Sequence, residues 1–301
     1  MISAKIITDS TNGNGNRLTT FELEYPRMIH SEFLTHRVFS RNAASSRAIS
    51  IKKMMDQVLE KPAMPVYWGL DQSGMQAKGE HENTELCKLA WRVAANSALG
   101  SAQVLKDLGL HKQIVNRVLE PFQMIKTIVT ATEFDNFFWL RCHEDAQPEI
   151  KSLASIMYEE YNNSSPVFLQ PGEWHLPYIY KTNGQYFNKN EHDRTRGELS
   201  LEEAKKVSAS CCAQVSYRTL NDSLGKAVKI YDQLITNVPV HASPVEHIAT
   251  PMDNKVARGV THIGLGKDTD MWSGNFRGWI QYRQLIDNNV CTDFKQEKYI
   301  N

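Results

Sequence analysis

A short polar segment near the N-terminus carries the side chains best suited to chemistry. It reads Thr-His-Arg-Val-Phe-Ser-Arg-Asn-Ala-Ala-Ser-Ser-Arg over residues 35–47. No acidic residue occurs from Phe33 to Met55, although the whole chain has 34 basic and 34 acidic side chains. Guanidinium groups bind phosphate through several planar donors, and serine and asparagine add neutral donors. The segment therefore predicts a site for a phosphorylated ligand.

The composition limits the class of protein. With 301 residues, 41% of them hydrophobic and 23% charged, the chain resembles a globular protein of one large or two medium domains. A formal net charge of zero argues against a general nucleic-acid-binding protein. The N-terminus lacks the apolar core of a signal peptide, and no apolar run is long enough to cross a membrane. We expect a cytoplasmic protein with small-molecule ligands and neither nucleic-acid nor membrane partners.

The cysteines and histidines predict neither a disulfide framework nor a metal site. The five cysteines include no Cys-x-x-Cys pair, and their one adjacent pair is poorly placed for disulfide geometry. The ten histidines include no His-Glu-x-x-His motif. No Gly-x-Gly-x-x-Gly segment follows an expected strand, so a Rossmann dinucleotide site is not predicted either.

Strands are expected where β-branched or alternating apolar residues occur. The patterns at 4–8, 20–25 and 124–130 meet this condition. Residues 162–199 contain proline, glycine and asparagine with little periodicity. A segment of that length is long for a loop inside a compact domain, so we expect either a functional loop or a linker.

Helices are expected where apolar residues recur with helical spacing. The strongest pattern covers Glu85–Leu108, with Gly109 at its end, and a helical pattern also extends from Arg27 to about Phe39. Ser200-Leu-Glu-Glu203 fits a capping box at the start of a helix that ends at Ala213. Further helices are expected at Ile51–Lys61, Ile114–Leu119, Phe134–Arg141, Pro148–Tyr161, Lys226–Thr236 and Trp279–Asp287.

Three segments together resemble the flavin-dependent thymidylate synthases. Thr35–Arg47 is similar to the family's Arg-His-Arg motif, which continues with Ser, Asn, Ser and Arg at the same spacing. Asn136–Arg141 with Ala146–Ile150 resembles the family's Asn…Leu-Arg…Ala-Gln-x-Glu-Ile run. Cys212–Tyr217 followed by His241–His247 resembles the Cys-Ala-Arg-x-Ser-Tyr and Gly-His-x-Ser-Pro-x-Glu-His segments.

The order of these segments differs from the usual family order, in which the His-x-Ser-Pro-x-Glu-His segment comes first. The resemblance therefore implies a circularly permuted chain, similar to the larger bacteriophage forms that act in a host cytoplasm. Exchanging nearby termini for a linker leaves a fold intact. We expect residues 1–165 to form the nucleotide-binding part, 166–199 a linker or loop region, and 200–301 the flavin-binding part of one composite domain.

The resemblance implies a fold and a reaction. The fold is α/β (α+β), a sheet with packed helices, assembled as a homotetramer with sites between subunits. The reaction is the reductive methylation of dUMP to dTMP, in which methylenetetrahydrofolate supplies the carbon, FAD carries the hydride and NADPH reduces FAD. The protein then mainly positions its ligands and tunes their electrostatics.

The resemblance also assigns a dUMP site. Arg47 and Ser45 match residues beside the phosphate, and Arg141 matches the arginine that engages the uracil. A fixed cation at the uracil would stabilise charge that builds on a ring oxygen. Glu32 and Arg117 match further dUMP contacts. Arg141 and Ser45 are the predicted catalytic residues.

Structural alternatives exist for most of these assignments. The basic segment is also compatible with a solvated surface loop. Arg141 is also placed to pair with Glu144 or Glu149. Glu32 is equally suited to a salt bridge with Arg27.

For FAD, the resemblance implies side chains from both halves of the chain, and three positions depart from the family. Thr35 replaces the first Arg of the motif, Ala43 replaces a Glu or Gln, and Thr132 replaces an Arg that often contacts FAD. These departures leave open hydroxymethylation of dUMP, or action on dCMP. The FAD-binding residues implied are His36, Arg37, Asn136, His241, Ser243 and Glu246.

Two other hypotheses stay open. In one, the basic segment binds a phosphate or a nucleic-acid backbone without catalysis, which the neutral total charge disfavours. In the other, the enzyme uses a cysteine nucleophile, for which Cys142 beside Arg141 is the candidate. A buried, apolar role is more typical of such a cysteine.

Overall fold

The computed structural model describes residues 1–188, 198–216, 220–253 and 271–292. The chain divides into two compact units, and each is built from several stretches of sequence. One unit contains Met1–Ile7, Thr20–Ser165 and Val215–Thr219, and the other contains Thr8–Thr19, Pro166–Gln214 and Leu220–Asn301. Tyr217, the last residue of one predicted motif, lies outside the described residues.

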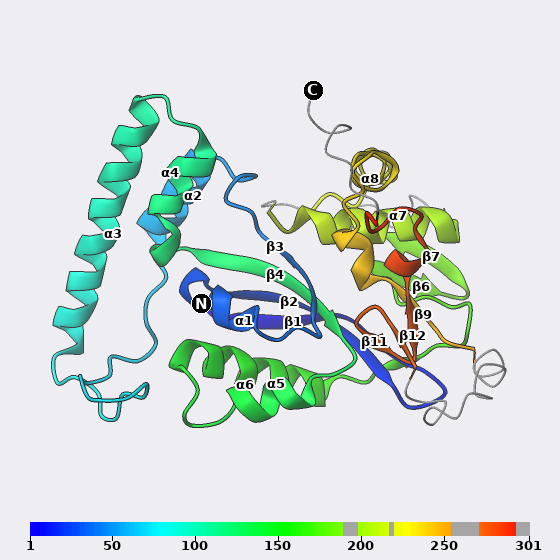
Figure 1. The fold of residues 1–301 in the computed structure, drawn as a ribbon, viewed down its shortest axis with the longest axis horizontal. Helices are drawn as coiled ribbons and strands as arrows, with labels where there is room; N and C mark the ends of the chain where they lie inside the picture. The colour runs from blue at the N-terminus through cyan, green and yellow to red at the C-terminus, as the bar shows by residue number, and fades with distance from the viewer. Residues whose placement is uncertain (189–197, 217–219, 254–270, 293–301) are drawn as a thin grey trace. The chain divides into compact units, whose positions relative to one another are not determined.

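A five-stranded sheet has the strand order β3-β4-β2-β1-β5 (Figure 1). The three predicted strands are confirmed, and each is longer than expected. β1 covers Ser3–Thr11, β2 covers Arg17–Pro26 and β4 covers Met124–Ala131. In β2 the alternating Phe21, Leu23 and Tyr25 are fully buried, as a strand with one face toward the core requires. β3 (Ser40–Ala43) pairs antiparallel with β4, and β5 (Val167–Phe168) pairs parallel with β1.

Two predicted helices pack against the sheet in the first unit (Figure 1). They are α5 (Asp135–Arg141) and α6 (Pro148–Asn163). Gln147 caps α6 by accepting hydrogen bonds from the first-turn amides, and proline occupies the first helical position, where no amide hydrogen is needed. The buried faces of these helices and of β2 and β4 form one hydrophobic core. That core fixes the position of Arg141, the last residue of α5.

Three more helices of the first unit share a second hydrophobic core. These are α2 (Ile51–Glu60), α3 (Thr84–Asp107) and α4 (Lys112–Val118), all close to the predicted ranges. Gly109 has a φ of 80°, which glycine adopts without strain, so it ends the α3 segment as expected.

The predicted helix at 27–39 is only partly present. A 3-10 turn covers Arg27–Ile29 and α1 covers His30–Phe33, after which the chain turns toward β3. The Arg41 guanidinium donates to the carbonyl oxygens of Leu34 and His36 at 2.9 and 3.0 Å. Those carbonyls therefore bond to a side chain, and the helix stops.

The second stretch of the second unit, which starts at Pro166, lies in the segment expected to be a loop or linker. That expectation is wrong for its described part, which contains β5 and three short strands that form a sheet of their own. These strands are β6 (Ile179–Thr182), β7 (Gln185–Asn188) and β8 (Glu198–Leu199). Weak periodicity over four-residue and two-residue strands explains why the pattern was missed.

Two helices of the second unit match the prediction. The capping box of Ser200 and Glu203 opens α7 (Leu201–Ala213). The next helix consists of α8 (Leu224–Tyr231) and a π-helical turn at Asp232–Thr236.

The predicted C-terminal helix at 279–287 is wrong. β12 (Trp279–Gln281) pairs antiparallel with β9 (Ala249–Pro251), and a 3-10 turn follows at Tyr282–Leu285. Trp279 and Gln281 are buried while the residue between them is half-buried, which is the two-residue period of a strand. A short hairpin, β10 (Trp272–Ser273) and β11 (Phe276–Arg277), precedes it.

All five cysteines are free. Among the residues that the structure describes, no helix has both the length and the apolar character that a membrane crossing needs.

Candidate functional site

Arg141 is held at the end of α5 by two acceptor atoms from one neighbouring turn. Its Nε donates to Nε2 of His36 at 3.0 Å, and its terminal nitrogen donates to the hydroxyl of Thr35 at 3.4 Å. The acceptors lie more than a hundred residues away in sequence. The guanidinium is therefore oriented before any ligand arrives.

His36 is suited to this role because it is neutral. Its side chain is buried, with its ring 4.8 Å from that of Phe137 and 5.8 Å from that of Phe39. Burial, together with the positive charges of Arg141 and Arg41, lowers the pKa of His36 from 6.5 to about 4. A neutral imidazole keeps one nitrogen as an acceptor, and that nitrogen receives the Arg141 bond.

Thr35 is the second acceptor for Arg141. Its hydroxyl donates to the backbone oxygen of Glu32 at 2.7 Å, which leaves oxygen lone pairs for the guanidinium. An arginine at this position, as in the family motif, would bring a second cation to the same place. The departure at Thr35 thus has a structural consequence that the sequence did not predict.

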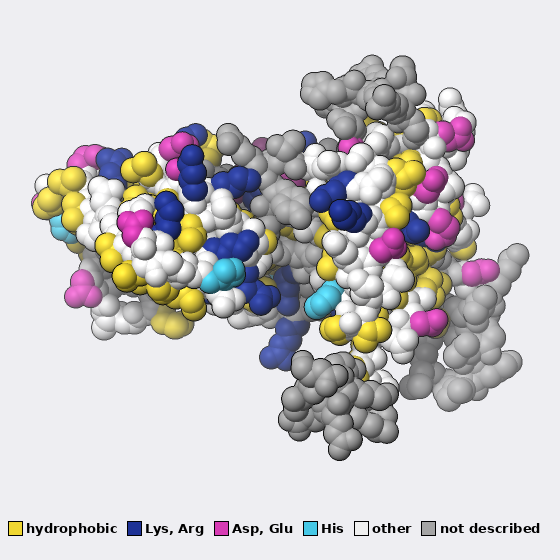
Figure 2. Space-filling view, turned by 90° about the horizontal axis from the view of Figure 1, so that it is seen from above, with side chains coloured by type: hydrophobic (Ala, Val, Ile, Leu, Met, Phe, Trp, Pro, Cys, Tyr) yellow, Lys and Arg dark blue, Asp and Glu magenta, His cyan; other side chains and the backbone are white. Residues whose placement is uncertain are grey.

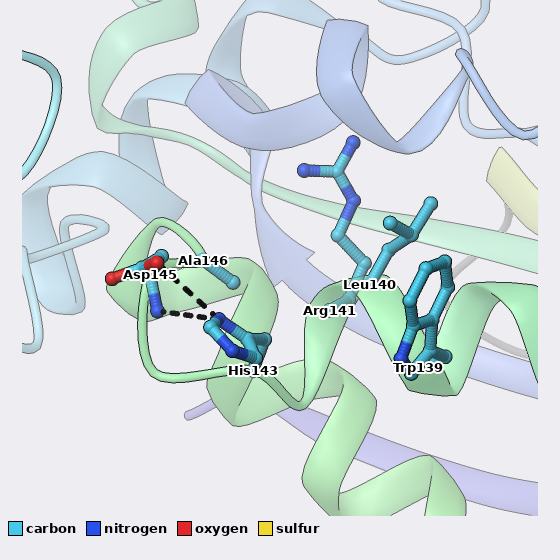
Figure 3. Close-up of a pocket in the computed structure, with 6 residues that line it drawn as sticks. All are labelled: Trp139, Leu140, Arg141, His143, Asp145 and Ala146. Carbon is cyan, nitrogen blue, oxygen red and sulfur yellow. Dashed lines mark hydrogen bonds and ion pairs between the residues drawn. The ribbon is translucent and has the colours of Figure 1, made fainter.

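Arg141 also lines a hollow of about 460 Å³ in the first unit. Figure 3 shows Arg141 between Trp139 and Leu140 on one side and the His143–Asp145 pair on the other. Trp139 is 75% exposed, which is unusual because contact of its large apolar ring with water is unfavourable. Because Trp139 and Arg141 both line this hollow, it offers an aromatic surface and a cation to a planar ring with polar edges. The sixth lining residue is Ala146.

The alternative ion pairs considered for Arg141 and Glu32 do not form among the described residues. Arg141 makes no ion pair with Glu144 or Glu149 among the described residues, and buried Glu149 instead accepts from the Val66 amide at 2.7 Å. Arg27 pairs with Glu120 at 2.9 Å and not with Glu32. Glu32, the predicted dUMP contact, is partly exposed on α1.

The predicted phosphate-binding residues Ser45 and Arg47 lie in a compact turn that leads into α2. The Ser45 side-chain oxygen accepts from the Arg47 amide at 3.3 Å, and its carbonyl accepts from the Ala48 amide at 3.0 Å. Arg47 is exposed, and its guanidinium has no partner within the described residues. The backbone of the turn is thus ordered while its cation is available.

The surface around this turn is positively charged. Figure 2 shows Lys and Arg side chains gathered over the α2 and α4 part of the first unit. The first turn of α2 has no acidic residue and carries exposed Lys52 and Lys53. Lysines at this end add to the positive end of the helix dipole, where acidic residues are usually preferred. Such a surface favours a dianionic phosphate over a neutral ligand.

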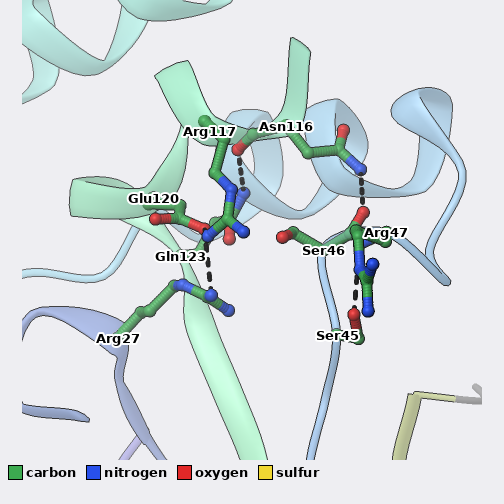
Figure 4. Close-up of polar contacts among 8 residues, drawn as sticks. All are labelled: Arg27, Ser45, Ser46, Arg47, Asn116, Arg117, Glu120 and Gln123. Atoms are coloured by element: carbon green, nitrogen blue, oxygen red, sulfur yellow. Dashed lines mark hydrogen bonds and ion pairs between the residues drawn. The ribbon is translucent and has the colours of Figure 1, made fainter. Parts of the chain in front are cut away.

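Arg117 is close to this surface but partly engaged. It pairs with Glu120 at 2.8 Å, and the same carboxylate oxygen accepts from Arg27 (Figure 4). The Arg117 side chain is 54% exposed, so one carboxylate shared by two guanidinium groups leaves it with unused donors.

The predicted FAD residues fall in both units. In the first unit, Arg37 and Asn136 are exposed. In the second unit, His241 and Ser243 are exposed beside or within a 3-10 turn at Ser243–His247. Glu246 forms an ion pair with Arg283.

The structure brings together some of the predicted residues and adds others. His36, a predicted FAD residue, binds Arg141 directly, and the predicted pair Ser45 and Arg47 forms one turn. Thr35 and Trp139 were not predicted as site residues. Trp139 directly follows Phe137 and Phe138, which are the buried residues of α5, so it falls on the exposed side of the helix. This position in the expected helix was the sequence feature that could have identified Trp139.

Residues 18–167, about half of the chain, match the model of a family described as thymidylate synthase complementing protein. The chain belongs to this family. The matched residues include the Thr35–Arg47 and Asn136–Ile150 segments, and they end before His241–His247. No curated protein matches the chain.

The chain is also similar to solved structures of bacterial proteins. One is a UMP/dUMP methylase PolB from Streptomyces cacaoi bound with 5-Br dUMP, at 15% identity and a TM-score of 0.46, covering 54% of this chain and 90% of that one. Another is the flavin-dependent thymidylate synthase ThyX from Helicobacter pylori complexed with FAD and dUMP. It has 14% identity and a TM-score of 0.36, and the match covers 48% of this chain and 67% of that one.

Proposed function

We propose that this protein is a flavin-dependent thymidylate synthase that converts dUMP to dTMP. Membership of the thymidylate synthase complementing protein family supports the reaction class. The observation that carries the assignment is the orientation of Arg141 by neutral His36 and by Thr35, in a hollow that exposed Trp139 also lines. A fixed cation in such a hollow suits the stabilisation of negative charge on a uracil oxygen.

The phosphate of dUMP would bind at the basic turn. Arg47 supplies an available guanidinium, Arg117 supplies a second one, and Ser45 supplies a hydroxyl. We propose Glu32 as a further nucleotide contact. The protein's contribution is then to hold the phosphate at one end of the nucleotide and the uracil at the other.

The residues fit FAD in part. Exposed Arg37 and Asn136 offer donors suited to its diphosphate, and exposed His241 and Ser243 offer further polar contacts. The imidazole of His36 is already engaged by Arg141, so we propose that it acts on FAD only indirectly. Glu246 would first have to release Arg283. When bound, FAD would carry a hydride from NADPH toward the carbon unit.

The proposed net reaction is balanced. The dUMP C5 loses its hydrogen and gains a methyl group, methylenetetrahydrofolate becomes tetrahydrofolate, and NADPH with one proton becomes NADP⁺. A second hollow of about 810 Å³ shares Asp145 and Ala146 with the Arg141 hollow and is lined by Tyr67 and Trp91. We propose it as the place of the aromatic folate, which aromatic side chains would contact by stacking.

Cys142 is unsuited to the alternative, cysteine-dependent mechanism. Its thiol is half-buried, and burial raises its pKa above the ordinary value. Since the thiolate is the nucleophile, a raised pKa lowers reactivity. The flavin-dependent reaction needs no cysteine.

The absorption spectrum of the purified protein tests the redox half of this proposal. We expect a flavin band that survives gel filtration after FAD is added and that bleaches when NADPH is added without oxygen. A protein that retains no flavin under either condition would contradict the assignment. A non-catalytic phosphate-binding protein would then be the better description.

We also propose a homotetramer in which α3 packs against a second copy. Leu86, Leu89, Val93 and Val104 of α3 are each more than half exposed. The hydroxyl groups of Ser97 and Ser101 lie between them, but both donate to backbone carbonyls of α3 itself, so the stripe is effectively apolar.

A second copy in antiparallel orientation fits this stripe. Glu85 lies in the first turn of α3 and Lys106 in the last, so each helix end would face an opposite charge. Introducing a charge with Val93→Glu should reduce the assembly measured by sedimentation, whereas Gln103→Glu, beside the buried face, should not. Unchanged assembly in Val93→Glu would contradict this interface.

The permuted segment order remains part of the proposal. The family match ends at residue 167, and the His-x-Ser-Pro-x-Glu-His segment follows far downstream, in the second unit. We propose that residues 200–301 supply the flavin-binding part. A His241→Ala variant should therefore lose FAD while it keeps dUMP binding, and retention of FAD would contradict this role.

A further inference from the structure

Asn116 is a fully buried amide beneath the turn that carries Arg47. It belongs to α4 and has no exposed surface. Its Nδ2 donates to the carbonyl oxygen of Ser46 at 2.7 Å and to that of Ile49 at 3.0 Å. Figure 4 shows the side chain extending from α4 toward this turn. Both amide hydrogens are thus committed to the two sides of one turn.

The same amide is not fully satisfied. Its Oδ1 is buried and has no hydrogen-bond partner. A buried polar atom without a partner is destabilising, so Asn116 is not explained as an optimised core residue. The two hydrogen bonds that its Nδ2 donates fix the turn, and this offsets the unfavourable burial of Oδ1.

Asn116 is also linked to a second pair of cations, Arg27 and Arg117. Its backbone oxygen accepts from the buried Gln123 side chain at 3.1 Å, and the Gln123 backbone oxygen accepts from the Arg27 amide at 2.8 Å. Arg27 and Arg117 share the Glu120 carboxylate. Asn116 is therefore bonded to the Arg47 turn through its side chain and adjoins Arg117 in the chain.

We infer that Asn116 is a positioning residue that sets the Arg47 turn relative to Arg117, so that both guanidinium groups meet one phosphate. This inference rests on the proposed dUMP function. Arg47 is exposed, and ordering an exposed loop on binding costs affinity. Because Asn116 holds the backbone of the turn in advance, only the Arg47 side chain has to become ordered when the ligand binds.

The test compares dUMP with deoxyuridine, which lacks the phosphate. Binding of each is measured by calorimetry to the FAD-loaded protein and to its Asn116→Ala, Arg47→Ala and doubly substituted forms. In Asn116→Ala we expect dUMP affinity to fall about tenfold, the effect of roughly one lost hydrogen bond, with deoxyuridine affinity unchanged. The double variant should bind dUMP no worse than Arg47→Ala, because Asn116 acts through Arg47.

Gln57→Ala is the matched control. The Gln57 amide also donates to a backbone carbonyl, that of Met124 at 3.3 Å, but it does not touch the turn. This variant should lower the melting temperature without changing the ratio of the two affinities. An equal ratio in Asn116→Ala and the unaltered protein, or additive losses in the double variant, would overturn the inference.

A second variant and a hydrogen-exchange measurement complete the test. If Asn116→Ala does not fold, Asn116→Asp keeps the side-chain shape, and hydrogen exchange of residues 45–49 in the unaltered protein needs no variant. We expect these amides to be protected before dUMP is added, and protection that appears only with dUMP would contradict pre-positioning. If the unaltered protein binds no dUMP, the proposed function fails as well. Normal dUMP binding with an unchanged ratio refutes the Asn116 role alone.

Discussion

Two arginines of the first unit are prepared for their proposed ligand in opposite ways. The side chain of Arg141 is fixed, because His36 and Thr35 accept two of its hydrogen bonds. The side chain of Arg47 is unrestrained, and only the backbone of its turn is fixed, through Asn116. A cation that must stabilise charge developing on a ring benefits from a fixed direction, whereas a phosphate accepts donors from many directions. We therefore expect Arg141 to act mainly on the rate and Arg47 mainly on affinity.

The largest expected effect is that of Arg141→Ala on the rate. Loss of one pre-oriented donor to a developing charge typically lowers kcat by about 100-fold or more. Steady-state dTMP formation measures this, and Arg92→Ala, which removes an exposed arginine from α3, is the control. If Arg141→Ala raised KM and left kcat unchanged, the distinction between the two arginines would be wrong.

Arg47→Ala should affect binding more than turnover. A charge-assisted contact to phosphate contributes about 1.5–3 kcal/mol, so dUMP affinity should fall roughly 10- to 100-fold. Calorimetry with dUMP measures the loss, and Lys53→Ala, on the same surface, should have a smaller effect. A tenfold fall in kcat at saturating dUMP would instead assign Arg47 to the chemical step.

Replacing His36 with leucine should have an intermediate effect on the rate, about tenfold, because Arg141 keeps its charge but loses its better acceptor. It should also change the pH dependence of stability. The pKa of His36 is about 4 in the folded protein and 6.5 when unperturbed, so only the unfolded chain takes up its proton between these values.

The stabilising contribution of neutral His36 is therefore present above pH 6.5 and is lost as the pH falls toward 4. Urea unfolding at several pH values should give a shallower decline for His36→Leu than for the unaltered protein. Parallel declines would mean that His36 is not the neutral acceptor described.

The smallest expected effect is that of Thr35→Val. The bond from Arg141 to the Thr35 hydroxyl is long, at 3.4 Å, and lies at an exposed position, so its loss should lower kcat only about two- to fivefold. Thr35→Ser keeps the hydroxyl and serves as the control. Equal losses in both variants would show that the methyl group, and not the hydroxyl, matters.

Local patterns predicted the elements, and sequence motifs predicted many candidate residues, but not the contacts between them. The alternation of apolar residues in β2, their helical repeat along α3 and the capping box of α7 each involve residues only a few positions apart. The sequence alone therefore indicates these elements. The hydrogen bond between His36 and Arg141, and that between Asn116 and Ser46, join distant segments. No spacing rule covers such pairs, which only the packed sheet and helices bring together.

Where local signals were weak or misleading, the prediction was wrong. Trp279–Gln281 is a strand because the antiparallel partner β9 buries alternate residues, although the segment that follows has helical spacing. The helix expected beyond Phe33 ends because the Arg41 side chain takes its carbonyl oxygens. In both cases a contact from outside the segment decided its structure.

The central claim is that the protein transfers a carbon unit to dUMP with a flavin as hydride carrier. Mass spectrometry of the nucleotide after incubation with FAD, NADPH, methylenetetrahydrofolate and dUMP tests it most directly. We predict dTMP that forms only when NADPH and the folate are both present. Unchanged dUMP from a protein that retains FAD would contradict the claim. A hydroxymethylated nucleotide would contradict the proposed methyl product, and conversion of dCMP instead of dUMP would contradict the proposed substrate.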